Sequence, residues 1–176
     1  KWELGYAGMV SNGNEIENFG DNNSSKDLTG RLQLSYVFAG QGPLRQDANV
    51  FAWHQSGKRT YGGTDYDRTR EGVGFRVTKG PFRTSGEYIR GEGMIAAGPN
   101  PPVLPAAGNL EPPYNLNIAP TGKADGWYLE GGWRIFPKWE IEARYDVFDR
   151  NYDDAAAERL FKTWTLGGQY FINKNT

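Results

Sequence analysis

Two alternating runs joined by a tight turn fill the stretch from Trp127 to Arg150. In both runs nearly every second residue is apolar, and most of the residues between are polar or charged, on either side of Phe136-Pro137-Lys138. Successive side chains of a strand point to opposite faces of a sheet, so this period of two predicts a β-hairpin. One face is apolar, with Trp127, Leu129, Gly131, Trp133, Ile135, Trp139, Ile141, Ala143, Tyr145 and Val147.

Such a hairpin suits two environments. In a soluble β-sandwich its apolar face is part of the core and its charged face meets bulk water. In a membrane barrel the apolar face meets lipid and the charged face meets a wet lumen. The hairpin does not distinguish the two, so the rest of the chain must.

Composition narrows the fold class. The 176 residues suit a single domain over 1–176, and the absence of cysteine excludes disulfides and thiolate metal sites. No run of about 18 apolar residues exists, which excludes a transmembrane helix but not a barrel, whose strands are apolar only at alternate positions. Aromatic residues make up 14% of a glycine-rich chain with few helix caps, which predicts an all-β fold. The 20 basic and 21 acidic residues nearly balance, so nucleic acid is not expected as a partner.

The alternation predicts eight strands, at 1–10, 28–38, 47–56, 68–78, 82–94, in two runs within 127–150, and at 158–172. The register of the third is ambiguous, because either Val50 and Ala52 or Phe51 and Trp53 could face outward. The chain begins inside strand-like alternation with no signal peptide before it, which indicates a mature product or a fragment.

The connections alternate in length. Long or moderate ones are expected at 11–27, 57–67, 98–122 and 150–157, and short ones at 39–45, 79–81, 136–138 and 173–176. Seven prolines between Pro99 and Pro120 exclude a central strand there. Outer-membrane barrels have this asymmetry of short turns and long external loops, together with aromatic girdles at the strand ends. Aromatic residues do gather there, at Trp2, Tyr36, Phe38, Phe82, Trp127, Trp139, Tyr170 and Phe171. The pattern favours an antiparallel transmembrane β-barrel over a sandwich.

Several segments resemble the C-terminal portion of the phosphate-selective porin O/P family: Glu140–Asp146, Phe148–Asn151, Phe161–Phe171 and Asn173–Thr176. Gly86–Gly91 resembles the strand-and-loop pattern of the same family. The resemblance implies a trimeric channel in the outer membrane of Gram-negative bacteria, with a barrel of about sixteen strands. This chain offers eight strands and ends in a turn, so we expect part of a larger barrel. An eight-stranded barrel would close, but side chains would fill its lumen. The family's constriction residues lie largely in a first half that this chain lacks, so phosphate selectivity is not carried over.

Charged residues on the polar faces of the strands are the candidate pore-lining residues: Arg31, Arg70, Arg76, Arg83, Glu130, Arg134, Glu140, Glu142 and Arg144. Arginines in a pore would attract anions and raise their local concentration. The alternative is that they pair across neighbouring strands with Glu87, Glu130, Glu140, Glu142 and Asp146 and only complete the wall.

Other features carry weaker hypotheses. The proline-rich segment could enter the lumen or touch a neighbouring subunit, or it could be a surface loop. His54 is the only histidine, which excludes a His-rich metal site and favours a strand or rim position. Asp153 with Asp154, and Asp21 near Glu15 and Glu17, could bind a divalent cation, although such loops are commonly just solvated. We expect no defined metal site and no cofactor.

The sequence therefore predicts a passive transport protein without a covalent step. It would be an outer-membrane porin for small hydrophilic solutes, with anions such as phosphate implied by the resemblance. Its partners would be outer-membrane lipid, lipopolysaccharide, the solutes and the other subunits of a trimer. The alternatives are a non-conducting barrel that acts as a scaffold or sheath for a partner protein, and a soluble β-sandwich that binds carbohydrate on exposed aromatic residues.

Overall fold

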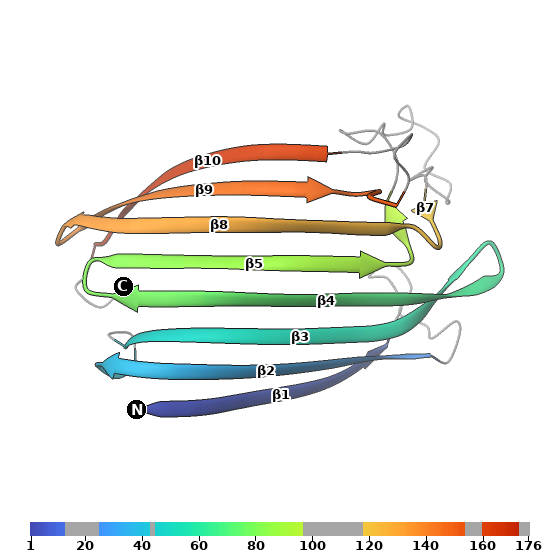
Figure 1. Ribbon diagram of the computed structural model, residues 1–176, viewed down its shortest axis with the longest axis horizontal. Coiled ribbons are helices and arrows are strands. Elements are labelled where there is room, and N and C mark those ends of the chain that lie inside the picture. Colours follow the sequence, from blue (N-terminus) through green and yellow to red (C-terminus); the bar gives the residue numbers. More distant parts are fainter. Residues whose placement is uncertain (13–24, 43–44, 97–117, 154–159, 173–176) are drawn as a thin grey trace.

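The computed structural model of the chain describes residues 1–12, 25–42, 45–96, 118–153 and 160–172. It is all-β, with one antiparallel sheet of eight long strands (Figure 1). In the described residues there is no helix that is long and apolar enough to cross a membrane. The sheet strands are β1 (Trp2–Asn12), β2 (Lys26–Ala39), β3 (Gln46–Tyr61), β4 (Thr64–Lys79), β5 (Phe82–Glu92), β8 (Lys123–Phe136), β9 (Trp139–Asp149) and β10 (Leu160–Tyr170).

The sheet is a meander in which each strand pairs with its neighbour along the chain. The order is β1-β2-β3-β4-β5-β8-β9-β10. The short strands β6 (Ile95–Ala96) and β7 (Ile118–Ala119) follow β5 and precede β8 in the chain, and they form a separate ladder with each other. Among the described residues β1 and β10 have one partner each and do not pair with each other. The sheet is therefore open, as a part of a larger barrel would be, and the eight strands do not close a barrel on their own.

The β3–β4 hairpin corrects one prediction. A loop was expected at 57–67, but both strands continue through it to a two-residue turn at Gly62 and Gly63. These glycines have φ angles of 58° and 79°, which a two-residue hairpin turn requires. The hydroxyl of Thr60 donates to Asp65 across the strands at 2.6 Å. The hairpin extends past its neighbours at one end of the sheet (Figure 1).

Short connections lie at the opposite end, which we call the short-turn end. There β4 passes to β5 through Gly80-Pro81 and β8 passes to β9 through Pro137-Lys138, as predicted. The N-terminus lies at the same end (Figure 1). We call the other end the long-loop end. The polar and proline-rich segments 13–24, 97–117 and 154–159, and the turn expected at 173–176, lie outside the described residues.

Outside the irregularities at Val37/Ala39 and Arg134/Phe136, the register assigns the residues of the eight-stranded sheet to one of two faces. Leu34 pairs with Val50, which pairs with Phe75, on what we call the apolar face. Gln33 pairs with Phe51 on the opposite, polar face. The ambiguity of the third strand is thereby resolved, because Val50 and Ala52 belong to the apolar face and Phe51 and Trp53 to the polar face.

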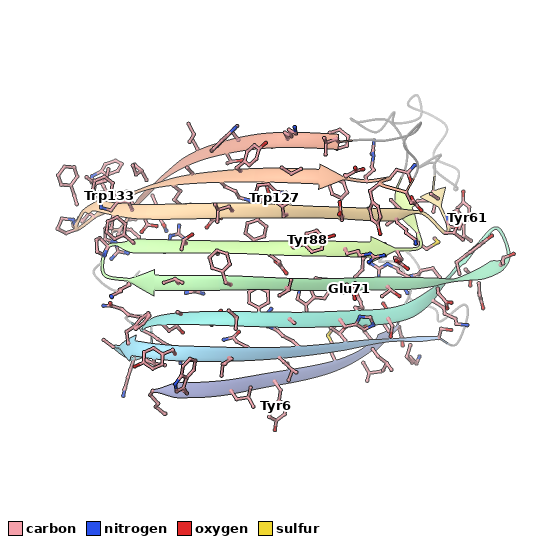
Figure 2. The ribbon with its side chains drawn as sticks, viewed as in Figure 1. Tyr6, Tyr61, Glu71, Tyr88, Trp127 and Trp133 are labelled. Atoms are coloured by element: carbon pink, nitrogen blue, oxygen red, sulfur yellow. The ribbon has the colours of Figure 1, made fainter. Side chains whose placement is uncertain are left out.

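Burial is the reverse of that in a water-soluble domain. The side chains of Tyr6, Leu166 and Trp164 are 84%, 80% and 71% exposed, whereas Asp27 and Glu140 are buried. Figure 2 shows aromatic side chains on strand after strand of the sheet, among them Tyr6, Tyr88, Trp127 and Trp133. A sandwich needs a second sheet large enough to cover its apolar face, and the second sheet in the described residues is only the two-residue ladder of β6 and β7. The sandwich interpretation is therefore wrong for this part of the chain.

Candidate functional site

The polar face carries all nine candidate pore-lining residues. Pairs such as Arg76 with Asn49 and Ser85, and Glu130 with Ser85 and Arg144, fix this by register. Strand alternation places the other candidates on the same face: Arg31, Arg70, Arg83, Arg134, Glu140 and Glu142. The structure separates these residues into three groups with different surroundings.

The first group is an ion-pair cluster on β5, β8 and β9. Arg83 is hydrogen-bonded to Glu140 and paired with Glu142 through separate guanidinium nitrogens, and its Nη1 lies 3.7 Å from Glu130 Oε1. Glu140 is 5% exposed and also lies 3.8 Å from Arg134 Nε. The cluster confirms, for Arg83 and Arg134, the expectation of pairing across strands.

Arg144 extends this cluster along β9. Its Nη1 lies 3.7 Å from Glu130 Oε2 and its Nη2 2.7 Å from Asp146 Oδ1. Its guanidinium carbon also stands 3.8 Å from the ring centroid of Tyr128. Arg144 is thus held by two carboxylates and a ring, and its charge is compensated locally.

Glu87 was expected to pair with an arginine, but it accepts hydrogen bonds from neutral groups. The indole Nε1 of Trp53 donates to its Oε1 at 2.7 Å, and the hydroxyl of Tyr128 lies 3.5 Å from its Oε2. Gly72 makes this possible, since a Cβ there would stand 2.6 Å from Trp53 Nε1. Glu87 therefore has no cationic partner among the described residues.

The second group is Arg31 and Arg76, which are exposed and line a hollow of about 450 Å³ over β1 to β4. Arg31 lies with its guanidinium carbon 4.0 Å from the ring centroid of Phe51 and donates to Gln33 Oε1 at 3.2 Å. In the described part of the chain neither Arg31 nor Arg76 has a carboxylate partner. Their two positive charges face the hollow without local compensation.

Arg45, in the connection between β2 and β3, borders the same hollow but is compensated. It donates to Glu3 Oε2 and to Asp47 Oδ2, both at 2.7 Å. These hydrogen bonds raise the pKa of the Arg45 guanidinium above its usual value. Glu3 and Asp47 are thus paired with Arg45, and neither forms an ion pair with Arg31 or Arg76.

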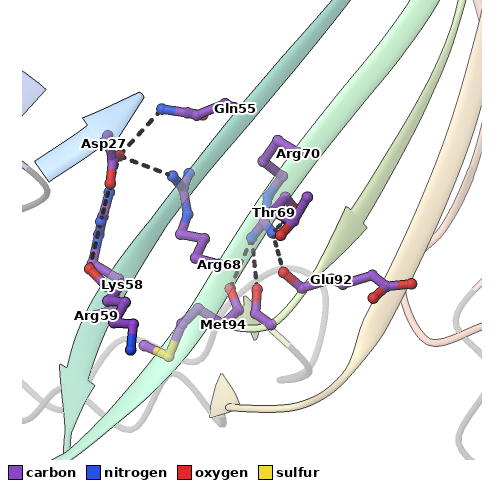
Figure 3. Close-up of polar contacts among 10 residues, drawn as sticks. Asp27, Gln55, Lys58, Arg59, Arg68, Thr69, Arg70, Glu92 and Met94 are labelled. Atoms are coloured by element: carbon purple, nitrogen blue, oxygen red, sulfur yellow. Dashed lines mark hydrogen bonds and ion pairs between the residues drawn. The ribbon is translucent and has the colours of Figure 1, made fainter. Parts of the chain in front are cut away.

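A second network lies at the long-loop end and is drawn in Figure 3. Arg59 donates to the buried carboxylate of Asp27 from both terminal guanidinium nitrogens, at 2.7 and 2.8 Å. Gln55 donates to the same carboxylate at 3.2 Å, and Arg68 Nη1 lies 3.6 Å from it. This network links β2 to β3 and β4 at the base of the projecting β3–β4 hairpin.

The third group is Arg70 alone, whose guanidinium is hydrogen-bonded to backbone carbonyls and not to a carboxylate. Its guanidinium donates to the carbonyls of Thr69, Glu92, Gly93 and Met94 at 2.7 to 3.3 Å (Figure 3). Met94 has a φ angle of 53°, so these bonds hold an unusual bend after β5. Arg70 is already committed to protein carbonyls.

The apolar face forms a band of aliphatic and aromatic side chains. Cross-strand ring pairs lie at the short-turn end, with centroids 4.9 Å apart for Trp2 and Tyr36 and 5.0 Å for Trp139 and Tyr170. Other rings meet nearer the long-loop end, where Tyr145 lies between Trp127 and Trp164. Such girdles occupy the two interfaces of a membrane barrel.

The band runs obliquely across the sheet. The row that begins with apolar Val10 and Leu28 becomes polar at Ser56 and Thr69 and charged at Glu92 and Lys123. At the other end of the strands, the row of Trp2 reaches β9 at Ala143, four residues beyond the aromatic Trp139. The strands are therefore tilted relative to the band, as the closure of a barrel requires.

On β3, His54 lies at the edge of this band that is nearer the long-loop end. Its Nδ1 lies 3.5 Å from Glu71 on β4, and both side chains are about half exposed. The structure thus places it on a strand, as predicted. No group of three or more metal-binding side chains occurs in the described residues; Asp153 belongs to them, whereas Asp154, Asp21, Glu15 and Glu17 do not.

Sequence reasoning missed Asp27, Arg59 and Arg68 because it placed them in loops or at strand ends. The available signal was the Gly62-Gly63 pair, which predicts a hairpin turn and so extends both strands. It also left out Arg45, a connection residue whose partners come from β1 and β3.

A family model described as phosphate-selective porin O and P matches residues 4–176, which is nearly the whole chain. No curated protein and no solved structure matches it. The match agrees with the tilted band, the aromatic girdles and the short turns gathered at one end. The chain belongs to the phosphate-selective porin O and P family.

Proposed function

We propose that the chain forms part of the wall of an outer-membrane porin through which small hydrophilic solutes diffuse passively. The observation that carries the proposal is the reversed burial: a continuous apolar face lies bare while carboxylates are buried on the polar face. Lipid solvates such an apolar face, and a water-filled lumen solvates the polar one. The family is one of channels, and diffusion through a lumen needs no covalent step.

The open edges indicate how the wall is completed. An unpaired strand edge in hydrocarbon costs several kcal/mol for each unsatisfied backbone group, so a β-sheet spans a membrane only as a closed barrel. We propose that further strands of the same barrel pair with β1 and β10. Following the family resemblance, three barrels form a trimer surrounded by phospholipid and lipopolysaccharide.

The lumen's preference for anions would depend on Arg31 and Arg76. The charges of Arg83, Arg134 and Arg144 are compensated by carboxylates, and Arg70 is bonded to carbonyls. Uncompensated cations on a pore wall raise the local concentration of anions. Small anions, phosphate among them, are therefore the solutes that we expect to pass most readily.

Single-channel recording of the full-length protein in a planar bilayer with a salt gradient tests this. The parent should open steadily with an anionic reversal potential. A unit charge about 8 Å away in water is worth about 0.5 kcal/mol, attractive for chloride and repulsive for potassium, so Arg31→Gln and Arg76→Gln should each lower the chloride-to-potassium permeability ratio about fivefold. The matched control is Lys162→Gln, which removes a charge from the apolar side of β10 and should leave the ratio unchanged.

Equal shifts in all three variants would contradict the assignment of selectivity to Arg31 and Arg76. Silence of folded parent protein would contradict the porin itself and favour a barrel that acts as a scaffold.

A further inference from the structure

A groove of about 630 Å³ crosses the apolar face near the short-turn end. Its floor is a row of cross-strand neighbours on five strands, with the small residues Thr84, Gly131 and Ala143 between Val77 and Leu166. The hydroxyl of Thr84 donates to the carbonyl of Glu130 at 2.8 Å, so the floor presents little polar surface. Phe82 stacked on Trp133, with centroids 5.9 Å apart, forms one wall.

Lys79 lines the same groove at its short-turn end. Its ammonium lies 5.5 Å from the ring centroid of Phe38, and that of Lys138, at the neighbouring turn, lies 5.9 Å from Tyr170. In the described part of the chain neither lysine has a carboxylate partner. The nearby acids Glu3, Asp47 and Glu140 all belong to the polar face.

The long-loop end of the apolar side differs. There Lys58 lies 3.8 Å from Asp67, and Lys123 lies 3.7 Å from Glu92. These lysines are thus paired with carboxylates, whereas Lys79 and Lys138, at the short-turn end of the same side, have no carboxylate partner among the described residues.

We propose that the groove holds an acyl chain of an anionic glycerophospholipid whose phosphate lies beside Lys79. The inference rests on the proposed function, since it needs the apolar face to be in a bilayer. The unpaired ammonium supplies charge complementarity to the phosphate, and the small floor residues leave room for the chain.

A second copy of the protein fits the groove less well. Copies in one membrane share an orientation, so their short-turn ends lie at the same depth. Among the described residues, the apolar face of such a copy brings lysine and no carboxylate to Lys79. Only the phosphate of a lipid supplies the missing negative charge.

Native mass spectrometry of the full-length protein in detergent, titrated with dioleoylphosphatidylglycerol, tests this. Gly131→Leu fills the floor and Gly30→Leu is the matched control, since a Cβ at either glycine meets nothing within 4 Å. The parent and Gly30→Leu should retain one lipid with equal affinity, and Gly131→Leu should bind it about tenfold more weakly, because several buried methylenes lose their contact. Lys79→Gln should lose the preference for phosphatidylglycerol over phosphatidylcholine.

Heat-modifiable gel mobility shows whether each variant is folded. Equal lipid retention by folded Gly131→Leu and folded Gly30→Leu would overturn the proposal. So would an oligomer that dissociates in Gly131→Leu while lipid retention is unchanged, since the groove would then lie between copies. The conductance of the same parent preparation separates the two proposals. A conducting parent without a variant effect on lipid contradicts the lipid site alone, and a silent parent with that effect contradicts the porin alone.

Discussion

At the scale of single residues, several glycines of this sheet make room for bulky side chains instead of bending the chain. A Cβ on Gly132 would stand 2.7 Å from Glu140 Oε1, and one on Gly74 would stand 2.6 Å from the ring of Phe51. The most severe case is Gly57, where a Cβ would lie 1.7 Å from Asp27 Oδ1. The ion pairs of the polar face therefore depend on residues that carry no charge.

Gly57→Ala should displace the carboxylate of Asp27 from Arg59 and destabilise the protein by about 1–3 kcal/mol, the cost of a buried polar group losing its partner. Urea unfolding in lipid vesicles, followed by tryptophan fluorescence, measures this. The control is Gly5→Ala on the same face of β1, where a Cβ meets nothing closer than 3.8 Å. Equal stability of the two variants would contradict the role given to Gly57.

Strand parity predicted the facing of every candidate arginine, but not its partners. Arg83 and Arg76 share a face, yet one is surrounded by carboxylates and the other is free of them within the described residues. The difference depends on which strand lies alongside and on the register between strands. The register between neighbouring strands cannot be read from a single sequence unless the positions of the turns are known.

At the scale of elements, the β3–β4 hairpin explains why its strands were predicted too short. Alternation is visible only where the two faces of a strand meet different environments. Beyond Ser56 and Thr69 polar residues occupy both faces, so the period disappears although the ladder continues to Tyr61 and Thr64. Within the apolar band, where the faces do differ, the strands were located to within a few residues.

The apolar band itself gives the prediction at this scale. Leu32 and Gln33 are consecutive residues of β2 that face opposite sides. Leu32→Arg should destabilise the protein by about 2–4 kcal/mol, since arginine on the lipid face near the bilayer midplane costs that much. Gln33→Arg should cost much less because its side chain reaches the polar face. Unfolding titrations in vesicles compare the two, and similar losses would mean that the apolar face does not meet lipid.

At the scale of the whole molecule, the two ends of the sheet differ in length and in charge. The projecting hairpin ends at Tyr61 at the long-loop end, and the β8–β9 turn holds Pro137 at the other. Short turns of outer-membrane barrels face the periplasm and long connections face outward. The protein should therefore expose its hairpin to the medium.

Cysteine labelling tests this orientation, because residues 1–176 contain no cysteine and the unsubstituted full-length protein is the control for labelling elsewhere. In intact cells that express the full-length protein, a membrane-impermeant maleimide should label Tyr61→Cys and spare Pro137→Cys. Both sites should react once the cells are lysed. The opposite pattern in intact cells would reverse the orientation and place the lysines of the short-turn end in the outer leaflet.

The meander order has a consequence for how such proteins change over evolutionary time. Every long strand pairs only with the strands next to it in the chain, apart from the small excursion through β6 and β7. A duplicated or lost hairpin thus leaves all other pairings intact, so a wall of this kind can gain or lose two strands without being rewired. Because barrel diameter grows with strand number, duplication or loss of a hairpin can change the width of a channel while the remaining strands keep their register.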